Sequence, residues 1–189
     1  MTAALIILAV VIAVIVLTAL FTFGIYNGLV RSKVRTQEAW SGIDVQLKRR
    51  ADLVPNLVET VRGYAEHERA VFENVTRARS MLQQAEGPAQ AAEANNQLTQ
   101  ALRSLFAVAE NYPQLRASEN FMALQRELSD IEEKIAYARQ FYNRNVSDFN
   151  SRILVVPNVF IARMFNFQPF EFFEAEEEAR EAPEVSFQR

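Results

Sequence analysis

The stretch AALIILAVVIAVIVLTALFTF occupies residues 3–23 and is interrupted only by Thr18 and Thr22. About 20 apolar residues are enough for a helix to cross roughly 30 Å of hydrocarbon, where every backbone polar group has to be bonded within its own segment. The stretch therefore predicts a transmembrane helix, and we assign residues 1–30 to this anchor and its flank. The rest of the chain is expected to be a body that is held to the membrane at one end.

The charges around the stretch indicate its orientation. No charged side chain precedes it, whereas Arg31, Lys33 and Arg35 follow it closely and the first acidic residue is Glu38. The positive-inside rule then predicts an outside N-terminus and a cytoplasmic body, with an extracytoplasmic body as the alternative. A cleaved secretory signal would need a basic segment before a shorter apolar core, so an uncleaved anchor is preferred.

The composition of the body favours helices. Ala, Leu, Glu, Gln and Arg are abundant, and Pro and Gly are rare in the middle of the chain. The sequence has no cysteine, which excludes disulfides and thiolate chemistry. From Glu171 onward there are seven acidic residues and two arginines, so the body itself is nearly neutral and a nucleic-acid partner is not expected.

Apolar residues recur at helical spacing through most of the body. The pattern predicts helices over 31–82, with a kink at Pro55 or a break capped by Asp52, over 89–112 and over 118–150. We expect an all-α fold in which the anchor continues into a long antiparallel bundle, spanning 31–152, of three long helices and a short C-terminal helical segment. The acidic tail, 174–189, is predicted to be largely disordered.

A phenylalanine-rich segment follows the third predicted helix, over residues 153–173. It has two prolines, and its only charged residues are Arg163 and Glu171. So apolar a segment has to be buried in the bundle, in a partner or in the lipid surface. Bundle or partner packing at the membrane-distal end is preferred, with docking through Phe160, Phe165, Phe167, Phe170, Phe172 and Phe173.

The predicted helix lengths suggest self-association. The three helices would be about 78 Å, about 35 Å and about 48 Å long, so an antiparallel arrangement leaves the start of the first helix uncovered. A helix contact in the membrane is expected at the small residues Gly24 and Gly28. Copies of the chain are expected to pair through a membrane-proximal stripe, here called the stalk stripe, of Val34, Trp40, Ile43 and Leu47.

Candidate chemistry is sparse. The single histidine, His67, is not part of an H-E-x-x-H motif, and no glycine-rich phosphate loop is present. No catalytic residue, cofactor or metal is expected, and His67 is interpreted as a solvated helix-surface residue. Polar residues near Pro55 are candidates for docking an anionic partner, although Asp52 capping a turn is the simpler interpretation: Arg49, Arg50, Asp52 and Asn56.

Short motifs are spread along the whole chain. They include YNGLV at 26–30, Trp40, RRADLVPNLV at 49–58, Tyr112-Pro113, Glu119-Asn120-Phe121 and FFEAE at 172–176. Together they resemble the LemA family of bacterial single-pass membrane proteins. The resemblance implies a membrane-anchored helical bundle with its N-terminus outside, and it does not point to any catalytic activity. The expected location is the bacterial cytoplasmic (inner) membrane.

These observations favour a non-catalytic, self-associating scaffold or adaptor of the bacterial cell envelope. The expected partners are the lipid bilayer, other copies of the chain and other envelope proteins. A membrane-remodelling oligomer that shapes the bilayer is the alternative, and an enzyme of unknown type comes third.

Overall fold

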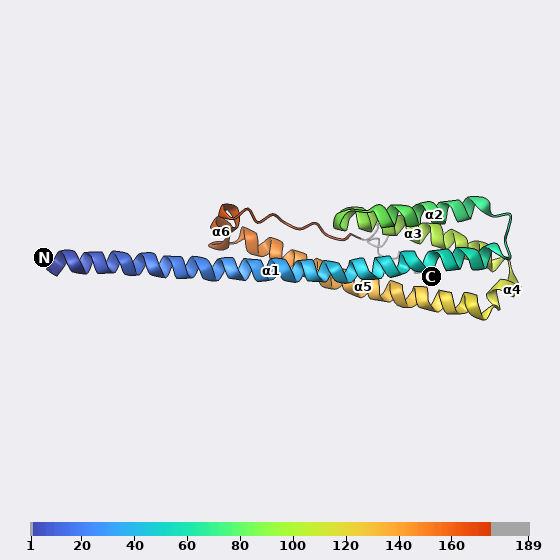
Figure 1. Cartoon of the computed structure of the whole chain (residues 1–189), viewed down its shortest axis with the longest axis horizontal. Coiled ribbons are helices and arrows are strands. Elements are labelled where there is room, and N and C mark those ends of the chain that lie inside the picture. The colour runs from blue at the N-terminus through green and yellow to red at the C-terminus, as the bar shows by residue number, and fades with distance from the viewer. Residues whose placement is uncertain (1, 175–189) are drawn as a thin grey trace, which may run out of the picture. The chain divides into compact units, whose positions relative to one another are not determined.

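A computed structural model of the chain describes residues 2–174. These residues form helices and connecting segments and contain no strand (Figure 1), which confirms the predicted all-α fold. The disorder predicted for the acidic tail falls on residues 175–189, which lie outside the described part of the chain. The helices are α1 (Thr2–Arg62), α2 (Arg69–Gln84), α3 (Gly87–Glu110), α4 (Pro113–Arg116), α5 (Glu119–Leu154) and α6 (Asn158–Met164).

Helix α1 is continuous over 61 residues and includes the apolar stretch. The large hydrophobic side chains from Leu5 to Phe23 are all at least 48% exposed, so no other part of residues 2–174 covers them. By its length and composition this part of α1 can cross a membrane.

The single helix predicted over 31–82 is wrong. Helix α1 ends at Arg62, and residues 63–68 form a loop that leads into α2. Gly63 weakens the helix at this point, because glycine loses more backbone freedom on folding than other residues. Both helices carry apolar residues at the same spacing, so periodicity alone did not reveal that the chain reverses direction between α1 and α2.

The described residues divide into two compact units. The first, here called the anchor unit, combines residues 2–39 with 143–170, and the second, the bundle unit, combines residues 40–142 with 171–174. Helices α1 and α5 each contribute to both units.

The bundle unit is built from residues 40–62 of α1, from α2 and α3, and from residues 119–142 of α5. Figure 1 shows α2 and α3 side by side, and their sharp connection passes through Gly87, whose φ of 81° is in the region that favours glycine. The core consists of apolar side chains from all four segments, including Ile43, Leu57, Val75, Leu98, Leu105 and Ile131.

Pro55 lies inside α1 without ending it. Proline has no backbone N–H, so the carbonyl of Ala51, one turn earlier, loses its helical donor. The Nε–H of Arg79, on α2, donates to this carbonyl at 2.7 Å. An arginine from the neighbouring helix thus replaces the hydrogen bond that proline removes, and the predicted break capped by Asp52 does not occur.

Because of this hydrogen bond, the contribution of Arg79 to stability should depend on the presence of Pro55. We expect Arg79→Met to lower the free energy of unfolding by about 1.5–3 kcal/mol, the usual range for a charged donor. The loss should be clearly smaller in a Pro55→Ala background, where the alanine N–H can bond the Ala51 carbonyl. Urea unfolding of the wild type, the two single variants and the double variant measures the coupling between positions 55 and 79. The exposed Arg77→Met is the control. Equal losses from Arg79→Met in both backgrounds would contradict the pairing of Arg79 with the Ala51 carbonyl.

Candidate functional site

The phenylalanine-rich segment packs beside α1 just after the apolar stretch. The ring of Tyr26 lies 4.7 Å from that of Phe165 and 5.9 Å from that of Phe167, centroid to centroid. Ile161 and other buried residues of α5 and α6 form a core cluster with Leu29 in the anchor unit. The predicted position at the membrane-distal end is wrong, because the α1–α2 reversal changes the direction of every later helix.

Asn150 holds the end of this segment in place. Its side-chain Nδ2 donates to the carbonyl of Phe170 at 2.9 Å, and its Oδ1 accepts the Phe170 N–H at 2.9 Å. The rings of Phe149 and Phe170 pack at 5.1 Å. The irregular stretch that follows α6 is therefore fixed at Phe170, because the Asn150 side chain donates one hydrogen bond to its backbone and accepts another from it.

A second aromatic cluster belongs to the bundle unit. The ring of Trp40 lies 5.6 Å from that of Tyr142 and 6.1 Å from that of Phe173, and Tyr142 and Phe173 are buried. The hydroxyl of Tyr142 donates to the backbone carbonyl of Glu171 at 2.8 Å. Burial, together with the negative charge of Glu171, raises the pKa of Tyr142 to about 12.

This raised pKa predicts a loss of stability in alkali. Tyr142 stays protonated in the folded state while the unfolded chain ionises near pH 10, so the stabilisation is complete below pH 10 and disappears as the pH rises to about 12. We expect Tyr142→Phe to cost about 1 kcal/mol at neutral pH, through the lost hydrogen bond, and to decline less than the wild type above pH 10. Urea unfolding across this range measures both effects. The exposed Tyr137→Phe should follow the wild type, and a parallel decline of the Tyr142 variant would refute the assignment.

The stalk stripe is not left uncovered. Ile43 and Leu47 are buried within the chain, Trp40 is half-buried in the aromatic cluster, and only Val34 is exposed. The expectation that this face lacks cover is therefore wrong, because within the bundle unit α5 contacts α1 through Tyr142 at Trp40 and through Glu132 at Arg50. At Gly24 and Gly28 an added Cβ would meet no atom within 4 Å, so a helix contact there stays a prediction.

The polar group around Pro55 separates into a surface and a core part. Arg49, Asp52 and Asn56 are exposed on α1, whereas Arg50 is buried with a side-chain exposure of 1%. The Arg50 guanidinium pairs with Glu132 of α5 and bonds Asn95 of α3. The four predicted docking residues therefore do not form one site.

Arg50 joins three helices of the bundle unit. Besides Asn95 and Glu132 it donates to Thr99 of α3 at 3.0 Å, while its Nε is buried with no hydrogen-bond partner among the described residues. Burial lowers the pKa of Arg50, and the neighbouring Glu132 carboxylate opposes this shift. These contacts fix the register of α1, α3 and α5, which is a structural role.

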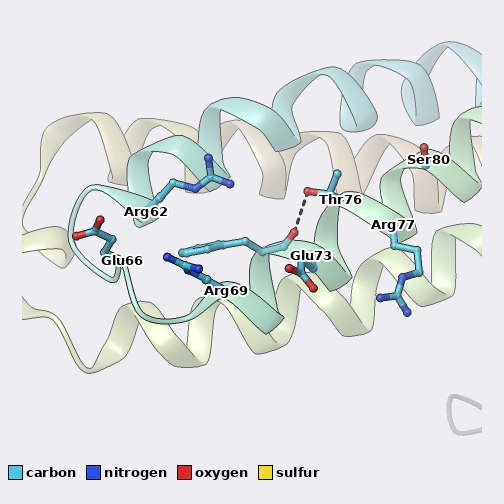
Figure 2. A pocket seen from close by; sticks show the side chains of 8 residues that line it. Arg62, Glu66, Arg69, Glu73, Thr76, Arg77 and Ser80 are labelled. Atoms are coloured by element: carbon cyan, nitrogen blue, oxygen red, sulfur yellow. Dashed lines mark hydrogen bonds between the residues drawn. The ribbon is translucent and has the colours of Figure 1, made fainter.

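A surface cleft of about 740 Å³ lies where α1 turns into α2. Figure 2 shows Arg62, Glu66 and Arg69 near the connecting loop and Arg77 farther along α2. Its apolar base is Phe72, and the Arg62 guanidinium lies 5.4 Å from the centroid of that ring. Sequence reasoning missed this cleft because it placed these residues along one continuous helix.

The cleft offers charged and polar contacts. Its lining includes three arginines and two glutamates, with Thr76 and Ser80 as neutral polar groups. Within residues 2–174, no group of three or more acidic or histidine side chains could hold a metal ion. His67 is exposed, as predicted, but it lies in the loop at 63–68 rather than on a helix.

The LemA family profile matches residues 39–187, which covers the whole bundle unit and all of α5 and α6. The chain belongs to the LemA family. It is 26% identical over 152 residues to Protein LemA of Metamycoplasma hominis, covering 80% of this chain and 69% of that protein. It is also 25% identical over 187 residues to Magnetosome protein MamQ 2 of Paramagnetospirillum magneticum, covering 85% and 68%. For Magnetosome protein MamQ of Magnetospirillum gryphiswaldense the identity is 24% over 174 residues, covering 78% and 64%.

The resemblance found in the sequence is thus confirmed. Several LemA motifs have structural roles in this chain. RRADLVPNLV contains Arg50 of the three-helix network and Pro55 with its arginine partner, and Trp40 and Phe173 pack together. Tyr26 of YNGLV contacts the phenylalanine-rich segment. The motifs of the family in this chain therefore coincide with contacts inside each of its two units.

Proposed function

We propose that this LemA protein is a membrane-anchored, non-catalytic scaffold of the bacterial cell envelope that organises partner proteins. The observation that carries the proposal is the exposed apolar stretch of α1, since the same continuous helix supplies core residues to the bundle unit. An anchor that is part of the folded core can hold a body at a membrane without a flexible linker. The positively charged flank supports an outside N-terminus and a cytoplasmic body.

The cleft between α1 and α2 is the docking surface we assign to partner proteins. Its three arginines, against two glutamates, suit a segment with acidic side chains. Self-association is proposed only through Gly24 and Gly28, since the buried Ile43 and Leu47 are not available for it.

Single-cysteine labelling tests the anchor and its orientation, because the chain has no cysteine of its own. Tyr137→Cys places the label on the exposed surface of the bundle unit. In intact spheroplasts a membrane-impermeant maleimide should not react with it, and lysis should restore the reaction. Reaction before lysis would place the body outside the cytoplasm, and extraction of the protein by alkaline carbonate would refute the anchor.

Photo-crosslinking in cells tests the docking surface. A photoreactive residue at Ser80 should give defined adducts with other proteins, and Arg69→Glu should remove them because it reverses a charge in the cleft. Arg49→Glu, which is exposed on α1 outside the cleft, is the matched control and should leave the adducts unchanged. Adducts that survive Arg69→Glu, or their absence altogether, would reject this surface.

Membrane remodelling is the second candidate, and the exposed apolar side chains around α6 favour it. Purified protein should then deform vesicles of phosphatidylcholine and phosphatidylglycerol when viewed by electron microscopy. Unchanged vesicles at a high protein-to-lipid ratio would leave the scaffold as the better account.

A further inference from the structure

Helix α6 and the turn before it are apolar on two opposite sides. One side is buried, where Ile161 and Ala162 pack in the core cluster with Leu29. The other side is solvent-exposed in this single chain, although water is an unfavourable environment for a contiguous apolar surface. It forms what we call the outer patch, whose six side chains are each at least 49% exposed: Leu154, Val155, Val156, Phe160, Met164 and Phe165.

The outer patch lies level with the end of the apolar stretch. Tyr26 follows Phe23 by three residues, which places it about 5 Å farther along the helix axis. The ring of Phe165 is 4.7 Å from that of Tyr26. The headgroup region extends about 5–8 Å beyond the hydrocarbon on each side. A bilayer that holds residues 3–23 therefore has its interface at the height of the patch.

The charges of the anchor unit suit an anionic lipid surface. By sequence, residues 2–39 and 143–170 contain six basic and two acidic side chains, and Arg163 is the only charged residue between Ile153 and Phe170. Arg152 and Arg163 flank the patch, and the Lys33 ammonium lies 5.9 Å from the Phe167 ring centroid. Interfacial helices bind membranes through this combination of apolar and basic side chains.

We propose that the outer patch inserts into the lipid interface beside the anchor and forms a second, peripheral membrane contact. The inference rests on the proposed transmembrane anchor. Lipid is the occupant because a bilayer surrounds α1 at this height on every side, so a protein partner would have to displace it. The contact orients the anchor unit on the membrane, since one transmembrane helix alone leaves rotation about its axis free.

Spin labels on single cysteines test this directly in the full chain. The labels replace Val156, Phe160 and Met164, with Leu17 in the apolar stretch and Tyr137 in the bundle unit as references, all of them exposed. The protein is reconstituted into vesicles of phosphatidylcholine and phosphatidylglycerol. Oxygen concentrates in lipid and a nickel chelate stays in water, so the ratio of their collision rates reports the depth of each label.

We expect a severalfold higher oxygen-to-nickel ratio at the three patch positions than at Tyr137, and the highest ratio at Leu17. A double variant, Phe160→Asp with Met164→Asp, should shift the label at Val156 toward the water value, whereas Tyr137→Asp should not. A label at Val156 that stayed in lipid in this double variant would show that the label itself, and not the patch, drives insertion.

Each other outcome overturns the inference in a recognisable way. Nickel-accessible patch labels with a lipid-like Leu17 would reject the patch contact and keep the anchor. Patch labels that are inaccessible to both reagents would show that protein, including a second copy of the chain, covers the patch. A nickel-accessible Leu17 would reject the anchor and with it the inference.

Discussion

Ile43→Glu is expected to unfold the bundle unit. Ile43 is fully buried, with an exposure of 0%, and a carboxylate there would be separated from water without a positive partner. Such a group costs several kcal/mol whether it stays charged or takes up a proton, and we expect a loss of at least about 4 kcal/mol at neutral pH. From the sequence alone, Ile43 was expected to pair copies of the chain through the stalk stripe, and in that case the variant would dissociate an assembly and leave the bundle intact.

Val45→Glu is the matched control for this experiment. Val45 lies two residues further along α1 and is 52% exposed, so the same change should alter stability by no more than about 0.5 kcal/mol. Thermal melting of the full chain in detergent, followed by far-ultraviolet circular dichroism, measures both variants. Equal melting temperatures would mean that Ile43 is not a core residue.

The second large effect is expected at the Arg50–Glu132 pair. Glu132→Gln leaves the buried guanidinium without its counter-charge and should cost about 2–3 kcal/mol. The value is below that of a fully buried pair because the Glu132 side chain is 42% exposed and water screens it. Arg50→Met should cost less, since Glu132 can turn to solvent.

A double-mutant cycle separates the pair from its surroundings. The variant with both changes should be more stable than the sum of the single losses predicts, because no buried charge remains. Glu133→Gln, at the exposed neighbouring position, should be near neutral. Urea unfolding measures the series, and additive losses would show that Arg50 is held by Asn95 and Thr99 rather than by the carboxylate.

The sequence predicted local structure better than tertiary arrangement. The apolar stretch, the all-α fold and the approximate limits of α3 and α5 follow from composition and spacing, which are local properties. The reversal at residues 63–68 was missed because the apolar spacing is similar on both sides of Gly63. This one error placed the phenylalanine-rich segment at the wrong end and left the stalk stripe without cover.

The candidate site depended on the same reversal. The cleft exists only because Arg62 and Arg69 lie on two antiparallel helices, and no local pattern brings them together. The position of Arg50 was predicted wrongly for a different reason. Its charge suggested a surface role beside Arg49, whereas its partners lie 45 and 82 residues away along the chain. Such long-range pairs are set by packing.

The bond from Arg79 to the carbonyl exposed by Pro55 has an evolutionary consequence. Loss of the proline restores an ordinary helical donor and removes the selective pressure on position 79. Among homologues, arginine at position 79 should therefore co-vary with proline at position 55, and chains that have lost the proline should tolerate many residue types at its partner position.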